Sequence, residues 1–123
     1  MWELEPHVGF EHQFKKFSKK HEDEASAALS NLQTYLSVLK RTNNLPAANL
    51  LPFVHPEPEG MVAIDQRGVK IEKKQGKLKA TRLYVYAYVE NETVYLLGIG
   101  DKDSQKQDIA TCREKVRQIK GSK

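Results

Sequence analysis

Two consecutive strands in the C-terminal half constrain the fold of this chain most strongly. Residues 78–89 and 93–99 are rich in β-branched and aromatic side chains and are separated only by Glu90-Asn91-Glu92. So short a connection makes the two strands pair as an antiparallel hairpin. With Val89 opposite Thr93, strand alternation predicts one nearly apolar face that belongs to the core and carries Leu83, Val85, Ala87, Val89, Tyr95, Leu97 and Ile99.

The opposite face of the predicted hairpin is aromatic and cationic. Tyrosines and an arginine at a spacing of two residues suit stacking on nucleic-acid bases and pairing with phosphate. Burial under another element explains the same pattern, because aromatic side chains in strands usually pack. The sequence leaves both interpretations open for this face, which carries Arg82, Tyr84, Tyr86, Tyr88, Val94, Leu96, Gly98 and Gly100.

The remaining elements follow from changes in hydrophobic period. Residues 2–6 alternate like a short strand, and residues 9–20 and 22–41 show helical spacing, as do residues 104–120. The two N-terminal helices join at His21 and form an αα-hairpin. We therefore predict a single α+β domain, with the N-terminal strand and the αα-hairpin packed on one face of a small antiparallel sheet and a helix at the C-terminus. Its predicted core brings Phe14, Leu29, Leu32 and Leu36 against Leu83, Val85, Tyr95, Leu97 and Ile99.

A proline-rich segment separates the two halves. Residues 42–60 hold four of the five prolines and predict a long irregular connection, of the kind that often carries function. Beyond it, strands over 61–65 and 69–72 flank a predicted tight turn at Gln66-Arg67-Gly68.

The charge balance allows a polyanionic partner. Twenty lysines and arginines against sixteen acids give a net charge of +4, and five of the lysines lie together at Lys70, Lys73, Lys74, Lys77 and Lys79. Lysines also protect edge strands from aggregation, but beside Arg82 the run favours a polyanion.

Other site chemistries find little support in the sequence. The lone Cys112 excludes an internal disulfide framework and a cysteine zinc site, which favours a reducing cytoplasm. We expect no metal or other cofactor and no membrane span, because the histidines are scattered and no apolar run is long enough. Asp101 and Asp103 fit a turn and a helix cap. His55, in the proline-rich segment, is not favoured as a catalytic base, although it is not excluded.

Residues 79–86 (KATRLYVY) and 93–103 (TVYLLGIGDKD) resemble the RelE/ParE superfamily of bacterial toxins, including its HigB-like branch. In that family an arginine-bearing strand leads by a short turn into an apolar strand that ends in glycine and basic residues. Its nuclease members are toxins of type II toxin–antitoxin modules, and they cut messenger RNA in the ribosomal decoding site. The resemblance implies a metal-free attack of the 2′-hydroxyl on the adjacent phosphodiester, and a cognate antitoxin that blocks the same groove.

The resemblance also implies roles for individual residues. Arg82 matches the family's central-strand arginine and Lys102 its basic residue after the last strand, and with Tyr84 they form the expected catalytic set. The residues expected to bind RNA are Lys70, Lys77, Lys79 and Tyr86. The chain departs from the family in that residues 104–123 hold no tyrosine or histidine, so acid–base work passes to lysines, to Tyr84 or to a displaced histidine.

Two other functions remain open at this point. A member of the toxin fold can poison a protein target such as DNA gyrase without chemistry of its own. A degenerate basic module can act only by binding. For the toxin functions we expect an antitoxin around Lys70, Lys77, Arg82 and Lys102, and for the nuclease also the ribosome and its message.

Overall fold

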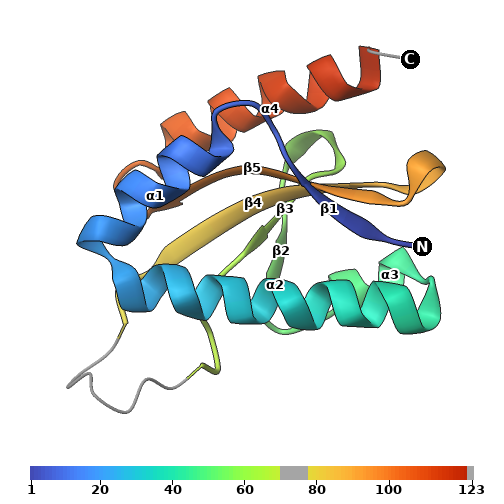
Figure 1. The fold of residues 1–123 in the computed structure, drawn as a ribbon, viewed down its shortest axis with the longest axis horizontal. Coiled ribbons are helices and arrows are strands. Elements are labelled where there is room, and N and C mark those ends of the chain that lie inside the picture. The colour runs from blue at the N-terminus through green and yellow to red at the C-terminus, as the bar shows by residue number, and fades with distance from the viewer. Residues whose placement is uncertain (70–77, 122–123) are drawn as a thin grey trace.

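The computed structural model describes residues 1–69 and 78–121 and shows an α+β fold with helices on both sides of one sheet (Figure 1). The elements, in chain order, are β1 (Glu3–Pro6), α1 (Phe10–Lys20), α2 (Glu22–Thr42), α3 (Leu45–Asn49), β2 (Val54–Pro56), β3 (Val62–Ile64), β4 (Thr81–Tyr88), β5 (Thr93–Asp101) and α4 (Gln105–Gly121).

The sheet has five strands in the order β1-β5-β4-β3-β2. Three of its four pairings are antiparallel, but β1 runs parallel to β5, so the sheet is mixed rather than wholly antiparallel as expected. The sequence shows where strands alternate, but alternation carries no information about the direction of pairing. The hairpin of β4 and β5 stands at the centre, as its sequence predicted.

Each face of the sheet has its own hydrophobic layer. α2 packs on one face, and α1 joins the same layer where it runs beside β5, as predicted for the αα-hairpin. α4 covers the other face, so that Cys112 and Val116 lie over Tyr84 and Tyr86 (Figure 1). The first layer is the larger, and its fully buried side chains include Leu32, Tyr35, Leu39, Leu83, Val85 and Val94.

A β-bulge corrects the predicted register of the central hairpin. Tyr84 lies opposite Gly98 but Val85 lies opposite Leu96, so β5 holds one extra residue at Leu97. A bulge reverses the alternation beyond it. Leu97 and Tyr95 therefore pack under α4 instead of in the α2 layer. Val94 and Leu96 occupy the α2 layer in place of them, although they were predicted on the opposite face.

The other residues of the predicted core face of the hairpin do lie in the core, except at the end of β4. Leu83, Val85, Ala87 and Ile99 lie in the α2 layer. Val89 lies beyond the strand in a 3-10 turn and is exposed.

The proline-rich segment is more regular than predicted. It contains α3, whose Asn44 side chain accepts a hydrogen bond from the Ala47 N–H, and the edge strand β2. Proline is tolerated at Pro56 because an edge strand leaves one side of its backbone unpaired. The expectation of an irregular connection is therefore wrong, and β2 places His55 and the following Glu57 beside β3.

The turn after β3 is confirmed. The Val69 N–H donates to the Gln66 carbonyl at 3.3 Å, and Gly68 takes the left-handed conformation, with φ of 82°, that glycine adopts without strain. The strand predicted for residues 69–72 falls mostly outside the described residues. Within the described part of the chain, no helix combines the length and the apolar character that crossing a membrane requires.

Candidate active site at one end of the sheet

Arg82 lies on the α4 side of the sheet, near the end where β4 begins. Strand alternation puts it on the same face as Tyr84, and its neighbour on β5 is Gly100, which has no side chain. Arg82 is partly exposed, and its guanidinium forms no hydrogen bond or ion pair with another described residue. A partly desolvated arginine that makes no direct contact with a described carboxylate suits an incoming anion, because its planar fork matches two phosphate oxygens.

His55 and Asp65 form a tight pair two strands away from Arg82. The His55 Nε2 atom lies 2.6 Å from Asp65 Oδ2, and the Asp65 side chain is only 8% exposed. The pair forms because β2 and β3 align His55 with Ala63, two residues before Asp65 on the same face. Asp65 thus orients the imidazole through Nε2, and Nδ1 has no partner among the described residues.

Glu57 completes the group from the turn that follows β2. Burial raises the pKa of this carboxyl group, and the charges of Arg82 and His55 oppose that shift without cancelling it. His55 pairs with Ala63 and Ala63 with Tyr84, so His55 and Arg82 lie on one face of the sheet, and both interact electrostatically with Glu57. The structure therefore brings together a carboxylate of raised basicity, an imidazole with an orienting carboxylate, and an arginine.

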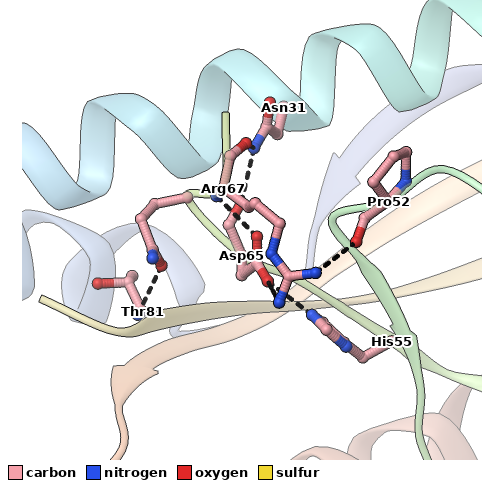
Figure 2. Close-up of polar contacts among 7 residues, drawn as sticks. Asn31, Pro52, His55, Asp65, Arg67 and Thr81 are labelled. Atoms are coloured by element: carbon pink, nitrogen blue, oxygen red, sulfur yellow. Dashed lines mark hydrogen bonds and ion pairs between the residues drawn. The ribbon is translucent and has the colours of Figure 1, made fainter. Parts of the chain in front are cut away.

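α2 holds this end of the sheet from the opposite face, as Figure 2 shows. Asn31, on α2, donates to the carbonyls of Asp65 at 2.8 Å and Arg67 at 3.0 Å. The Arg67 N–H donates to Asp65 Oδ1 at 2.7 Å, and its guanidinium reaches the Pro52 carbonyl. These contacts fix the backbone around Asp65, so the carboxylate that orients His55 is itself held on several sides.

The expected stacking tyrosines are not on the surface. Tyr84 is fully buried and Tyr86 is 9% exposed, and both lie under α4. Gly100 and Gly98 do not leave an open backbone either. A side chain at Gly100 would overlap the Asp108 carboxylate and the Ser104 hydroxyl, and one at Gly98 would crowd Cys112 and Gln13. Burial by α4 therefore explains the aromatic face, and it argues against base stacking by Tyr84 and Tyr86.

The expected lysines have different surroundings. Lys79 forms an ion pair with Asp101 at 3.1 Å, which raises the pKa of the lysine and lowers that of the aspartate. Lys102 is exposed directly after β5. Lys70 and Lys77 lie outside the described residues. Arg82, Lys79 and Lys102 thus share one end of the sheet, whereas Tyr84 and Tyr86 belong to the packing.

Sequence reasoning missed three members of the group, Glu57, Asp65 and Arg67, and did not favour the fourth, His55. A hint was present in the spacing of His55 and Asp65, which flank a short turn between two apolar segments. Because residues 54–56 were not recognised as a strand, the pairing of β2 with β3 that aligns His55 with Asp65 could not be predicted.

Two further features show how charge is distributed. Lys16 and Lys20 of α1 line a cavity of about 400 Å³ with Gly100, at the Arg82 end of the sheet. At the far end, a cavity of about 600 Å³ is lined by acidic and aromatic residues, among them Glu5, Glu90, Tyr88 and Tyr95. Asp101 and Asp108 also line the cavity at the Arg82 end, so it holds charges of both signs, whereas the far cavity is mainly acidic and disfavours a polyanion. No group of three or more metal-ligating side chains occurs among the residues that the structure describes.

Comparisons with known proteins add no assignment: no family model, no curated protein and no solved structure matches the chain.

Proposed function

We propose that this chain is the toxin of a toxin–antitoxin pair and a ribosome-dependent messenger RNA endonuclease, with His55, Glu57 and Arg82 as its reacting groups. The observation that carries the proposal is the Asp65-bound imidazole of His55, which shares a face of the sheet with Arg82 and interacts with Glu57, a carboxyl group whose pKa burial raises. The resemblance of residues 79–86 and 93–103 to the RelE/ParE toxins supports the choice of RNA and of the ribosome.

Cleavage by the 2′-hydroxyl needs a base, an acid and a cation. The Glu57 carboxylate accepts the proton of the 2′-hydroxyl, and the O2′–P bond forms as the P–O5′ bond breaks. His55 donates the proton of its free ring nitrogen, Nδ1, to the leaving O5′, while Asp65 holds the ring through Nε2. The products are a 2′,3′-cyclic phosphate and a 5′-hydroxyl, so no water and no metal ion takes part in this step.

Arg82 stabilises the charge that develops on the phosphate. The non-bridging oxygens gain negative charge as the fifth bond to phosphorus forms, and a preorganised arginine binds them more tightly in that state. Removing one such contact costs on the order of 3 kcal/mol, or about a hundredfold in rate. Lys102, exposed near the same end of the sheet, is the second cation and contributes less because solvent screens it.

The antitoxin in this proposal is an acidic segment that covers the Arg82 end of the sheet. Its expected contacts are Arg82 and Lys102, together with Lys70 and Lys77, which the sequence predicts and which lie outside the described residues. Exposed charge pairs are screened by salt, so the complex should weaken as ionic strength rises. A salt-insensitive complex, or a footprint confined to residues 42–60, would contradict this arrangement.

The experiment that tests the proposal compares purified variants on ribosome-bound message. We expect His55→Asn and Glu57→Gln each to lose about 10²- to 10⁴-fold in cleavage rate, and Arg82→Ala about a hundredfold. The matched control is His12→Asn, because His12 is an exposed histidine on α1, and it should cleave like the wild type.

The same experiment separates the other two functions. A wild-type protein that arrests growth without cutting the message would replace the nuclease with a toxin that poisons a protein target. A protein that neither cuts nor arrests growth would leave a basic binding module.

A further inference from the structure

A second group of cations lies on α4, next to the turn that carries Glu57. Arg113, Arg117 and Lys120 all point toward the carboxylate of Glu59, with N–O distances of 3.6, 3.5 and 3.8 Å. They share one side of the helix because they are spaced by four and three residues. Lys120 also donates to the Glu59 carbonyl at 3.1 Å and lies 5.6 Å from the centre of the Tyr86 ring. We call these three side chains the α4 cation cluster.

Glu59 takes an unusual backbone conformation to reach this cluster. Its φ is 64°, in the left-handed region that non-glycine residues other than asparagine and aspartate rarely adopt. The following Gly60 is also left-handed, so the turn is shaped by two consecutive residues of this kind. The conformation projects one carboxylate into the middle of three cationic side chains.

The α4 cation cluster is not fully satisfied by Glu59. Three positive charges face this carboxylate and that of Glu114, which pairs with Arg117 at 3.6 Å. The Arg113 Nε atom is buried and has no hydrogen-bond partner in the described part of the chain. The cations are each about half exposed and none lies closer than 3.5 Å to the carboxylate oxygens of Glu59, so the individual ion pairs are weak.

We propose that the α4 cation cluster is a second phosphate subsite, which binds a backbone phosphate beside the scissile one, and that Glu59 occupies it while RNA is absent. The inference rests on the proposed function, because it places the scissile phosphate at Glu57 and Arg82. A phosphodiester resembles a carboxylate in presenting two charged oxygens, so it fits the position that the Glu59 oxygens hold. RNA then displaces Glu59, and Arg113 gains an acceptor.

The position of the cluster fits an RNA strand that passes the proposed reacting groups. Glu57 and Glu59 lie two residues apart in one turn, so their α-carbons are at most about 7 Å apart. Adjacent phosphates of a single strand bridge such a distance. A strand whose reacting phosphate lies at Arg82 therefore continues along the turn toward Arg113 and Arg117, and an acidic peptide is the alternative that the test excludes.

The test measures binding of a single-stranded oligonucleotide that carries 2′-O-methyl groups and therefore is not cut. Glu59→Asn removes the competing carboxylate and keeps a residue that tolerates the left-handed conformation. Glu92→Asn is the matched control, because Glu92 is also left-handed, with φ of 50°, and lies in the turn between β4 and β5. Arg117→Gln removes one cation of the cluster, and thermal melting of each variant confirms that it is folded.

We expect Glu59→Asn to bind the oligonucleotide more tightly and with a steeper dependence on salt. One additional phosphate contact on a single strand steepens the slope of log K against log salt by about 0.7, so the gain in affinity at about 50 mM salt exceeds that at about 200 mM by roughly 2.6-fold. Arg117→Gln should weaken binding and flatten the slope by a similar amount, and Glu92→Asn should match the wild type.

Two results would overturn the inference. One is a folded Glu59→Asn variant that binds the oligonucleotide with the wild-type affinity and slope. The other is a gain for a polyglutamate peptide that equals or exceeds the gain for the oligonucleotide, which would assign the cluster to an acidic partner.

The inference and the proposed function fail in different ways. Tighter oligonucleotide binding by Glu59→Asn with a wild type that cuts no RNA would keep the subsite as a nucleic-acid contact and reject the nuclease. Unchanged binding by Glu59→Asn with loss of cleavage in His55→Asn would reject the subsite and keep the nuclease.

Discussion

Replacing Tyr84 by phenylalanine separates packing from catalysis at the aromatic face. The Tyr84 hydroxyl is fully buried and has no hydrogen-bond partner in the described part of the chain. Burial also raises the pKa of the phenol, so it stays protonated in the neutral range. A desolvated hydroxyl without a partner costs about 1–3 kcal/mol, and phenylalanine keeps the ring while it removes that cost.

We expect Tyr84→Phe to stabilise the fold by about 1 kcal/mol. An unfolding entropy of roughly 0.26 kcal/mol/K for a chain of this length converts that gain into a rise of about 4 °C in Tm. Cleavage of ribosome-bound message should stay at the wild-type rate, because the proposed reaction uses His55, Glu57 and Arg82 instead. Calorimetry and the cleavage assay measure the two effects on one preparation.

Tyr35 supplies the matched control for this substitution. It is equally buried, but its hydroxyl lies 2.8 Å from Asn49 Oδ1. Tyr35→Phe should therefore destabilise the fold by about 1–2 kcal/mol, because it leaves Asn49 without a partner. A Tyr84→Phe variant that melts lower than the wild type, or that loses tenfold or more in cleavage rate, would refute the reasoning.

The remaining predictions concern the proposed chemistry. Because burial raises the pKa of Glu57 and the base must be ionised, the acidic limb of kcat/KM should lie above the pH range of an ordinary glutamate. Arg82→Gln should move that limb to still higher pH, because Arg82 lowers the pKa of Glu57; a limb that does not move would remove Glu57 as the base. Arg82→Lys should restore only part of the rate lost in Arg82→Ala, and Lys102→Ala should lose less than Arg82→Ala, as rates on ribosome-bound message will show. EDTA should leave the rate of the purified protein unchanged, and loss of activity that added metal restores would contradict the mechanism.

The sequence was sufficient to predict the helices and strands that have a long and regular hydrophobic pattern. The three long helices and the central hairpin appear close to the predicted bounds, because their apolar residues follow one period over many positions. The strand predicted for 61–65 is confirmed as β3, but β2 has only three residues, too few for alternation to distinguish it from a loop. This is why the proline-rich segment was expected to be irregular.

The extra residue of the β5 bulge had a large effect on which side chains of the hairpin lie on each face of the sheet. The bulge at Leu97 is a local change, but it exchanges the sides of all preceding residues of β5. Nothing in TVYLLGIG marks it, because residues 94–97 are apolar or aromatic and fit either layer. The two glycines that follow are explained by side chains packed against them: Asp108 and Ser104 at Gly100, and Cys112 and Gln13 at Gly98.

The candidate site was predictable only where one residue carried the signal. Arg82 stands out because an arginine on an aromatic strand face is unusual. The link between His55 and Asp65 depends on strands whose pairing the sequence did not reveal. Glu57 becomes notable only through its burial and its cationic neighbours. The site therefore had to be assembled from pairing and packing rather than from a motif.

The chemical ends of a cleaved message test the central claim most directly. Purified protein, ribosomes and an RNA with one 2′-deoxynucleotide at the mapped cleavage position are compared with the all-ribose RNA. The account predicts a 2′,3′-cyclic phosphate and a 5′-hydroxyl from the all-ribose RNA, no cut at the deoxy position, and cleavage slowed about 10²- to 10⁴-fold by His55→Asn. A 5′-phosphate end, cleavage at the deoxy position, or an intact message after prolonged incubation would contradict it.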